Sequence, residues 1–205
     1  NVLNRPYSRD AARLEQFRQE ALITASITHP NVIKLYSVGY DQGYFYLAME
    51  LVGGGSLEQR IRRENKLTEG DALRIGHEVA EGLRAAQHQG LIHRDVKPAN
   101  VFITNAPAVK LIDFGLALLG DPDVGIAQTT EQSLAGTADF VAPEQALGLA
   151  LDARSDLYAL GITAFQLLTG RLPFSAPSST AILRRQVFEE APRVRAEVPE
   201  VPRAL

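Results

Sequence analysis

The stretch His93-Arg94-Asp95-Val96-Lys97-Pro98-Ala99-Asn100 is the part of this 205-residue sequence that decides its fold. It brings a carboxylate, an ammonium group and an amide close together, and a second carboxylate, Asp113, follows 18 residues after Asp95. Taken one at a time, such aspartates are more often exposed turn residues than functional groups. The interpretation therefore depends on the motifs that accompany this stretch.

Two further motifs follow in a fixed order. Asp113-Phe114-Gly115 comes directly after a predicted hairpin, and Ala142-Pro143-Glu144, preceded by Gly136-Thr137, comes later. A single tripeptide could arise by chance. The three motifs together, with a helix before them and a hairpin between the first two, resemble the catalytic domain of protein kinases. With Lys97 and Pro98, the first motif resembles the corresponding motif of serine/threonine kinases. The resemblance is greatest to bacterial kinases of the eukaryotic type.

The resemblance implies an α+β fold with two lobes, a truncated strand-rich lobe followed by a mainly helical one. We expect the first over residues 1–52, up to the hinge, and the second over residues 53–205. A cleft between two such lobes is a common place for a ligand. Gly53-Gly54-Gly55 lacks the G-x-G-x-x-G spacing, so we interpret it as a flexible connection between the lobes and not as a phosphate-binding loop.

Hydrophobic spacing predicts the individual elements. Apolar residues at intervals of three and four indicate helices, and short runs between turn signals indicate strands. The predicted helices cover residues 10–27, 57–63, 68–86, 152–169 and 179–189, and the strands 32–39, 44–51, 101–104 and 109–112. The helix over 152–169 is apolar almost all round, which predicts that it is buried. Residues 116–142 have no sustained periodicity, which is typical of a functional or mobile loop.

The resemblance assigns the chemistry residue by residue. Asp95 would accept the proton of a substrate hydroxyl, and Lys97 would place a positive charge beside the transferred phosphate. Asn100 and Asp113 would bind Mg²⁺, a hard cation that prefers oxygen ligands. The hydroxyl of Thr137 would bridge Asp95 and Lys97. The expected cofactors are therefore ATP and Mg²⁺, and the expected acceptors are serine and threonine hydroxyls of protein substrates.

The first part of the chain is expected to contribute to the ATP site. Glu20 resembles the helix glutamate that pairs with a strand lysine, which in turn holds the α- and β-phosphates. Residues 46–52 resemble the strand and hinge that hold adenine, with Met49 as gatekeeper and the backbones of Glu50 and Val52 as hydrogen-bonding groups. Phe102 would press on the ring from below. Core packing of Met49 and Phe102 is compatible with this role, because an adenine slot is core that lacks its ligand.

A further group of residues is expected to support the site or to regulate it. The resemblance gives structural roles to His93 packed against Phe114, to Gly115 and Glu144, and to Asp156, a carboxylate in apolar surroundings that needs hydrogen-bond partners. Arg94 directly precedes Asp95, and kinases with this arginine are often switched by phosphorylation of the loop between the second and third motifs. The candidate hydroxyls in that loop are Thr129, Thr130 and Ser133.

Two parts that the family would have are not found within these residues. They are a glycine-rich loop with the phosphate-binding lysine before Asn1, and helices after Leu205 with an arginine that pairs with Glu144. Asn1-Val2-Leu3 resembles the end of the lysine strand, so either Asn1 replaces the lysine or the lysine lies upstream. We expect these residues alone to transfer phosphate weakly or not at all, because a small misplacement can cost about a hundredfold in rate.

Two alternatives to an active protein kinase stay open. Asn1 in place of the lysine would favour a pseudokinase, a scaffold that binds nucleotide or partners without efficient transfer. A small-molecule phosphotransferase shares part of the fold. Arg94, Lys97 and residues 136–144 argue against this second alternative, because they resemble the parts that bind protein substrates.

Composition excludes several other classes of protein. The sequence has no cysteine, so a disulfide framework, a thiolate metal site and a catalytic thiol are ruled out. The net charge of −3 gives no general reason to expect nucleic acid as a partner. The longest apolar stretch, Leu157 to Leu168, is too short to span a bilayer. We expect a cytoplasmic protein, or the cytoplasmic domain of one whose membrane anchor lies outside these residues.

Overall fold

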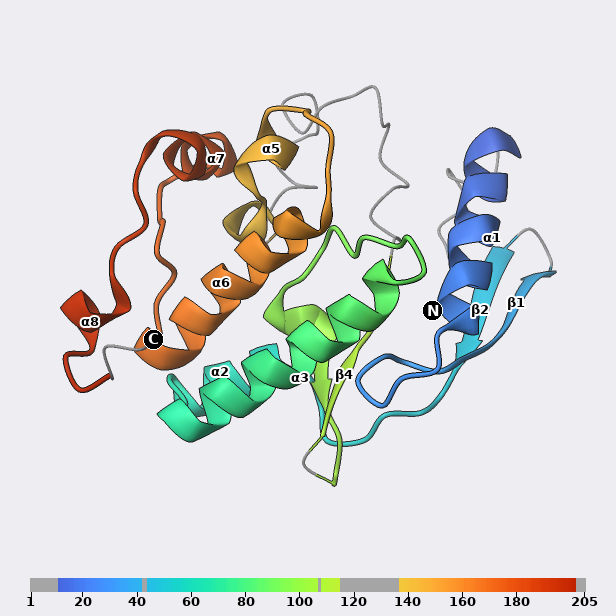
Figure 1. Ribbon diagram of the computed structural model, residues 1–205, viewed down its shortest axis with the longest axis horizontal. Helices are drawn as coiled ribbons and strands as arrows, with labels where there is room; N and C mark the ends of the chain where they lie inside the picture. The colour runs from blue at the N-terminus through green and yellow to red at the C-terminus, as the bar shows by residue number, and fades with distance from the viewer. Residues whose placement is uncertain (1–10, 42–43, 107, 115–136, 202–205) are drawn as a thin grey trace.

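The computed structural model describes residues 11–41, 44–106, 108–114 and 137–201. One small antiparallel sheet lies at one end of the molecule and a second lies within the larger, mainly helical part (Figure 1), so the predicted α+β class is confirmed. Within the described residues, no helix has both the length and the apolar character that crossing a bilayer requires.

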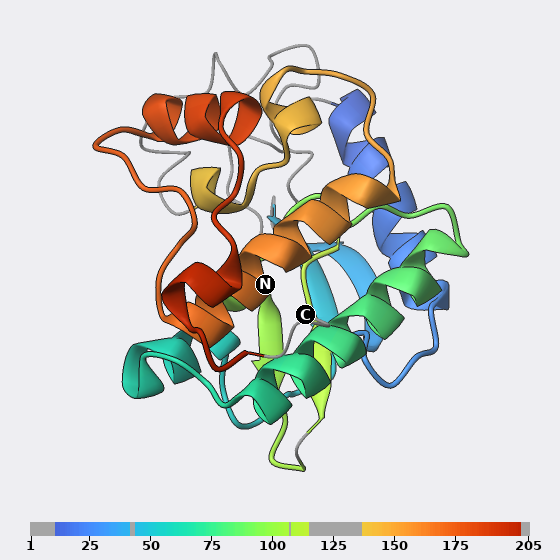
Figure 2. The same cartoon turned by 60° about the vertical axis from the view of Figure 1, so that its left-hand side comes forward.

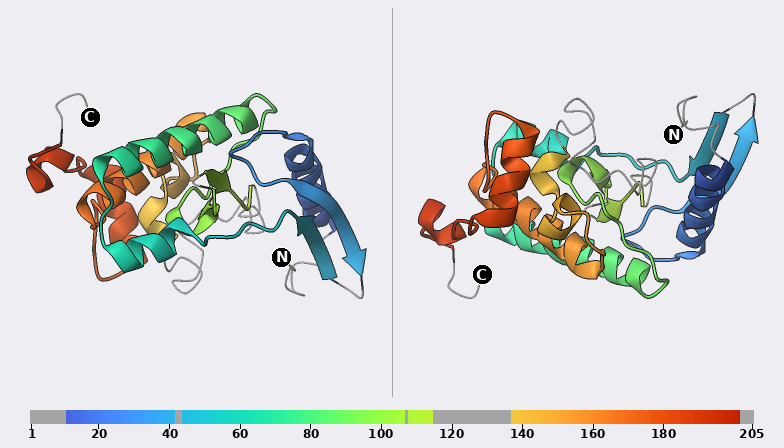
Figure 3. Two further views of the ribbon diagram at one scale, coloured as in Figure 1. Left: turned by 90° about the horizontal axis from the view of Figure 1, so that it is seen from below. Right: turned by 90° about the horizontal axis from the view of Figure 1, so that it is seen from above.

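One end of the molecule consists of a helix and the first hairpin. These elements are α1 (Ala11–Ser26), β1 (Leu35–Asp41) and β2 (Tyr44–Met49). The strands pair from Leu35 opposite Met49 to Asp41 opposite Tyr44, and α1 packs against β1. Seen from above and below, α1, β1 and β2 stand apart from the other helices (Figure 3).

The prediction that the first strand begins at residue 32 is wrong, and the hydrogen bonds show why. The backbone N–H of Ile33 donates to Leu111 O at 2.8 Å, and the N–H of Leu111 donates to Asn31 O at 2.9 Å. Residues 31–33 therefore pair with the second hairpin, and β1 starts only after them. An apolar run alone does not show which neighbour a strand will pair with.

The helical part is built around α3 (Glu69–Gln87) and α6 (Ala153–Thr169). The two helices lie side by side and run in opposite directions (Figure 2), and Leu67 N–H donates to Leu167 O where α3 begins and α6 ends. α6 starts at the side-chain cap of Asp152 and ends at Gly170, whose φ of 73° is easy only for glycine. Contrary to the prediction, α6 is not covered all round, since Leu157 is 55% exposed.

A second hairpin completes the core. Its strands, β3 (Val101–Ile103) and β4 (Val109–Leu111), pair antiparallel with Val101 opposite Leu111, as predicted from the two short apolar runs. α2 (Leu57–Glu64) packs against it and begins with the predicted cap, in which the Ser56 side chain accepts from Gln59 N–H. The fully buried apolar side chains of this core are Val32, Leu57, Ile75, Val79, Val96, Val101, Val109, Leu111 and Leu167.

Short elements and one longer helix make up the rest. They are the 3-10 turns η2 (Pro98–Asn100) and η5 (Ala138–Phe140), and the helices α5 (Pro143–Ala146), α7 (Ser179–Phe188) and α8 (Val194–Glu197). The prediction contained α7 but neither α5 nor α8, because a single turn is too short to show a helical period. The amide of Gln186 in α7 donates to Ala138 O and Asp139 O, which fixes η5 against α7.

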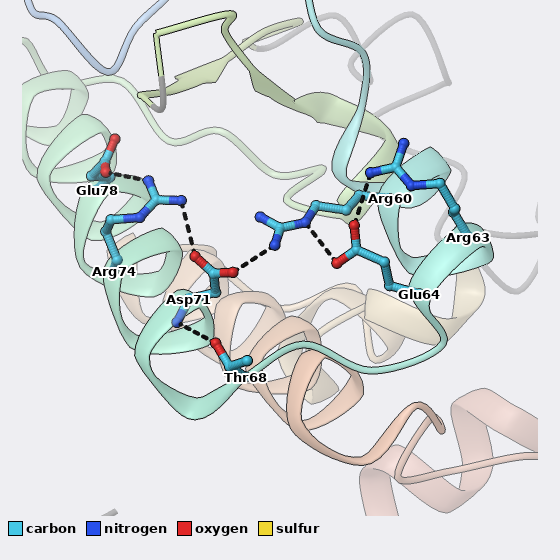
Figure 4. A network of polar contacts seen from close by, with 7 residues as sticks. All are labelled: Arg60, Arg63, Glu64, Thr68, Asp71, Arg74 and Glu78. Atoms are coloured by element: carbon cyan, nitrogen blue, oxygen red, sulfur yellow. Dashed lines mark hydrogen bonds and ion pairs between the residues drawn. The ribbon is translucent and has the colours of Figure 1, made fainter.

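A chain of ion pairs links α2 to α3 (Figure 4). Arg60 contacts Glu64 at 3.0 Å and Asp71 at 2.5 Å, and Arg74 contacts Asp71 at 3.5 Å and Glu78 at 2.8 Å. The hydrogen bond from Arg60 lowers the pKa of the Asp71 carboxyl. Partly exposed pairs of this kind contribute on the order of 1 kcal/mol each.

Candidate active site

The loop that carries the first motif is fastened to α6 by one buried carboxylate. Asp156, 5% exposed, accepts the backbone N–H of His93 on Oδ2 and that of Arg94 on Oδ1, each at 2.8 Å. Arg94 has a φ of 67°, a left-handed conformation that is unfavourable for residues other than glycine and needs such support. Burial raises the pKa of the Asp156 carboxyl, while the two N–H donors work in the opposite direction.

The His93 ring joins this loop to the segment after β4. Its Nε2–H donates to Ile112 O at 3.0 Å, and its Nδ1 accepts the backbone N–H of Asp95 at 3.3 Å. These partners assign the neutral ring with the proton on Nε2. The ring is fully buried, which lowers the pKa of the imidazole, and it lies 4.5 Å from the Phe114 ring centroid. A neutral ring with both nitrogens occupied is suited to hold the backbone in place and not to exchange protons.

Asp95, Lys97 and Asn100 form one cluster of side chains within the loop that carries the first motif. Asp95 Oδ2 accepts a hydrogen bond from Asn100 Nδ2 at 2.9 Å and lies 2.8 Å from Lys97 Nζ. Asp95 Oδ1 is buried and has no hydrogen-bond partner within the part of the chain that the structure describes. One oxygen of this carboxylate is therefore fixed, and the other is left to accept a proton or a donor from a ligand.

Thr137 reaches this cluster through Lys97. The Lys97 ammonium donates to Thr137 Oγ1 at 3.0 Å. The structure shows no corresponding hydrogen bond from Thr137 to Asp95, whose Oδ1 is unpartnered among the described residues. The geometry thus supplies one half of the predicted bridge, the half toward Lys97.

Asn100 and Asp113 lie on the two sides of the β3–β4 hairpin. The N–H of Ile112, the residue before Asp113, donates to Asn100 O at 3.0 Å, which holds the two ends of the hairpin together. Asn100 directs its Nδ2 to Asp95, to both the backbone oxygen and Oδ2, so its Oδ1 is left without a described partner. Asp113 has a φ of 59°, in the left-handed region.

This donor pair fits a magnesium ion bound together with phosphates. Mg²⁺ is held in such sites by one or two protein oxygens, with phosphate and water oxygens completing the octahedron. Asn100 Oδ1 and the Asp113 carboxylate supply oxygens of this kind. Among the described residues there is no group of three or more His, Asp or Glu side chains that could hold a metal ion without a ligand's help.

The residues predicted to bind adenine lie at the end of β2, in the segment after it and in β3. Met49, Val52 and Phe102 are partly buried, and Phe102 pairs with Ser56 in an isolated antiparallel bridge. The Glu50 side chain has partners that sequence reasoning missed, since its Oε1 lies 2.6 Å from Lys110 Nζ and accepts the N–H of Lys34 at 2.7 Å. No local signal points to them, because Lys110 lies on another hairpin far along the chain.

Two side chains that the sequence did not single out connect the third motif to the loop that carries the first motif and to α6. Gln145 Nε2 donates to Arg94 O at 3.0 Å, while its Oε1 accepts the N–H of Ala142 at 3.0 Å. Glu144 accepts a hydrogen bond from Ser155 Oγ at 2.5 Å. Ser155 precedes Asp156 on α6, so the first turn of this helix holds both the motif and the loop.

Several predicted residues lie outside the described residues. They are Asn1, Gly115 and the loop hydroxyls of Thr129, Thr130 and Ser133. For Glu20 the structure describes the backbone, within α1, but not the side chain. Their predicted roles stay predictions.

Comparison with known proteins identifies the family to which this site belongs. A family model described as the protein kinase domain matches residues 3–203, so the chain belongs to the protein kinase family. Members of this family generally use ATP with a divalent metal ion. The predicted resemblance to bacterial serine/threonine kinases is confirmed by the relatives described next.

Three relatives illustrate the likeness. The chain is 35% identical to the probable serine/threonine-protein kinase PknB of Lactococcus lactis, with 100% of the chain and 32% of the relative covered. It is 33% identical to the serine/threonine-protein kinase PrkC of Bacillus subtilis, covering 100% and 31%. It is 40% identical to the serine/threonine-protein kinase PksC of Streptomyces coelicolor, covering 92% and 35%. The chain thus spans about a third of the length of the curated relatives it matches.

Proposed function

We propose that this protein transfers the γ-phosphate of ATP to serine and threonine hydroxyls of protein substrates. The observation that carries the proposal is the buried Oδ1 of Asp95, which has no partner among the described residues, while Oδ2 is held by Asn100 and Lys97. A buried carboxylate oxygen left in this way is costly unless a donor occupies it, and a substrate hydroxyl is such a donor. The serine/threonine kinases among the relatives support the choice of acceptor.

The side chains of the cluster divide the work of the transfer. The substrate hydroxyl donates its hydrogen bond to Asp95 Oδ1, and its oxygen forms a bond to the γ-phosphorus as the bond to the leaving ADP oxygen breaks. The hydroxyl proton passes to Asp95. Asn100 and Lys97 hold Oδ2, so that Oδ1 keeps its direction. The Lys97 charge lies beside the transferred group, where negative charge must be balanced.

Other predicted residues would bind the nucleotide. Asn100 and Asp113 would hold Mg²⁺, which when bound neutralises phosphate charge. Met49, the backbones of Glu50 and Val52, and Phe102 would hold adenine, and Glu20 would pair with a phosphate-binding lysine. His93, Phe114, Gly115, Glu144 and Asp156 would support the loop. The division into lobes at residues 52 and 53 belongs to the same proposal.

Regulation, partners and location follow from the same proposal. Arg94 would pair with a phosphate on Thr129, Thr130 or Ser133 and so order the loop that contains them. The proposed partners are protein substrates and not nucleic acid. The cytoplasm, where ATP is abundant, is the proposed location. The pseudokinase alternative depends on Asn1, outside the described residues, and no comparison favours it.

The test is γ-phosphate transfer from magnesium ATP by the protein expressed from its complete open reading frame. Labelling of a generic protein substrate and of the kinase itself would be measured for the unmodified protein and for Asp95→Asn. We expect Asp95→Asn to lower the rate by about 10²–10⁴-fold, the usual contribution of a positioned proton acceptor.

A matched control separates chemistry from charge. Asp41→Asn makes the same change at the exposed end of β1 and should leave the rate unchanged. Equal rates for the unmodified protein and Asp95→Asn, with both proteins folded, would contradict the proposal. Absence of transfer in the unmodified protein would contradict it as well and would favour the pseudokinase alternative.

A further inference from the structure

A cavity of about 290 Å³ lies where the first hairpin meets the second. Its lining comes from three segments, namely residues within 27–34 between α1 and β1, Glu50 after β2, and Lys110 of β4. No described residue proposed for the transfer step lines it, and of the described residues proposed to bind the nucleotide only Glu50 does. The cavity is therefore separate from the catalytic cluster.

Glu50 supplies the one carboxylate among the described residues that line this cavity, and its charge is already balanced. Its Oε1 lies 2.6 Å from Lys110 Nζ and accepts the backbone N–H of Lys34 at 2.7 Å. The partly buried ammonium of Lys34 donates to Thr28 Oγ1 at 3.4 Å and forms no ion pair with any described residue. The cavity thus carries one positive charge for which the described part of the chain supplies no anion.

Two neutral side chains of the lining add hydrogen-bond donors beside this charge. Thr28 Oγ1 accepts from Lys34, so its hydroxyl proton is left to donate. His29 Nδ1 accepts the backbone N–H of Asn31 at 3.2 Å, which assigns the ring proton to Nε2 and leaves that N–H as a donor. Together with the ammonium, three side chains of one short segment therefore offer donors to a ligand.

The size and the chemistry of the cavity suit a small phosphate-bearing ligand. Its apolar lining consists of Ile27, Pro30 and Val32, and its volume lies at the lower end of the range for ligand pockets. Thr28 and Pro30 are exposed, so the cavity is open to solvent. A phosphate group presents three acceptor oxygens to the three donor side chains, whereas a carboxylate presents two. Lysine binds phosphate as a compact point charge.

We propose that this cavity binds the phosphate group of a small phosphate monoester, with Lys34 as the charged partner. The ammonium of Lys34, the hydroxyl of Thr28 and the Nε2–H of His29 donate to the phosphate oxygens. The organic part of the monoester packs on the apolar lining. This site goes beyond the proposed kinase function, because it requires neither ATP nor a substrate hydroxyl.

The test is isothermal titration calorimetry of the protein expressed from its complete open reading frame, without nucleotide or magnesium. The two ligands are propyl phosphate and butanoate, a carboxylate of similar length. We expect saturable binding of propyl phosphate and weaker binding of butanoate. Lys34→Met keeps an unbranched side chain and removes its charge. It should weaken the binding of propyl phosphate at least about tenfold, as expected for the loss of a hydrogen bond between charged groups.

Three further variants assign the binding to this cavity. Lys66→Met is the matched control, because Lys66 is exposed and outside the lining, and it should leave the affinity unchanged. Lys97→Met removes the lysine of the catalytic cluster and should leave the affinity for propyl phosphate unchanged as well. Glu50→Gln removes the carboxylate charge from the lining and should strengthen binding. This expected gain keeps the test informative where a loss could come from poorer folding.

Each outcome decides for or against the cavity. Absence of saturable binding of propyl phosphate overturns the proposal, and so does tighter binding of butanoate. Equal affinities in Lys34→Met and Lys66→Met, or a loss in Lys34→Met without a gain in Glu50→Gln, overturn it too. Binding that is lost in Lys97→Met and kept in Lys34→Met would place the phosphate at the catalytic cluster. That result overturns the cavity and leaves the proposed kinase function standing.

Discussion

The catalytic loop and the hairpin β1–β2 are attached to the molecule in different ways. The loop is held at several points by buried partners far along the chain, with Asp156 accepting two of its N–H groups and His93 bonding to Ile112. The hairpin end is joined through residues 31–33 and through Glu50. Its surface is open, with Tyr36 67% exposed and Leu51 99% exposed.

The difference shows where the chemistry is built. Every group of the proposed transfer step belongs to the helical part or to the second hairpin. Asp156 of α6 supports that arrangement by accepting two backbone N–H groups of the loop. The first hairpin and α1 would contribute to nucleotide binding through a junction with few contacts. Changes at the loop's supports should therefore affect both stability and catalysis. Changes at the junction should loosen one end and leave the loop in place.

The largest effect is expected where the loop meets α6. Asp156→Ala removes the acceptor of two buried N–H groups, and we expect the free energy of unfolding to fall by about 2–5 kcal/mol, with loss of phosphate transfer. Hydrogen exchange of the most protected amides of α3 and α6 in the complete protein would measure the loss.

Asp152 offers a matched control on the same helix. Its carboxylate caps α6 from the surface, accepting Arg154 N–H at 2.8 Å. Asp152→Ala should cost only about 1 kcal/mol and leave transfer intact. If the two alanine variants lost the same amount of stability, the buried anchor would not be the support that the geometry indicates.

A smaller and more local effect is expected at the junction of the first hairpin. Asn31 Nδ2 donates to Val109 O at 2.9 Å and to Glu78 Oε2 at 3.1 Å, and Glu78 Oε2 also accepts Val109 N–H at 2.7 Å. Asn31→Ala removes the side-chain donor to the buried Val109 O, while Glu78 keeps its bond from Val109 N–H, and should cost about 1–3 kcal/mol. Hydrogen exchange should show faster opening of β1 and β2 and unchanged protection of α6.

The control for the junction is an asparagine on the second hairpin. Asn105 is exposed and has no side-chain hydrogen bond among the described residues, so Asn105→Ala should change neither stability nor exchange. Uniform loss of protection across α6 and β1 in Asn31→Ala would mean that the two regions unfold as one unit. The contrast drawn between them would then be wrong.

Much of this architecture could be predicted from the sequence. The long helices follow from apolar spacing and from side-chain caps such as Ser56, because both signals are local. The cluster of Asp95, Lys97 and Asn100 was found by its motif, since the three side chains sit on one short loop whose turn brings them together. Local chemistry at fixed spacing is the kind of information that a sequence displays directly.

What the sequence could not show are contacts between distant segments made by ordinary residues. Gln145 supports the carbonyl of Arg94, Ser155 donates to Glu144, and Lys110 pairs with Glu50. Glutamine, serine and lysine are common on surfaces, and nothing in their surroundings marks them as partners. The strand that begins at Leu35 was misplaced for the same reason, since its limit depends on a pairing with Leu111.

The smallest of the expected effects concerns His93 and pH. Burial lowers the pKa of this imidazole in the folded protein, so the unfolded chain binds a proton more readily. Its contribution to stability is therefore complete above the ordinary histidine pKa of about 6.5 and is lost as the pH falls below that value. One proton taken up on unfolding gives a slope of at most about 1.4 kcal/mol per pH unit.

His93→Gln isolates this contribution. The glutamine amide keeps a donor for Ile112 O and cannot titrate, while Asp156, whose raised pKa acts in the opposite direction, is present in both proteins. Urea unfolding from about pH 7.5 to pH 5, without nucleotide or magnesium, should show a steeper loss of stability in the unmodified protein than in the variant. Parallel pH profiles would mean that His93 takes up its proton in the folded state. The Asp95 N–H would then have lost its acceptor, and the ring would not be the neutral support that its two hydrogen bonds require.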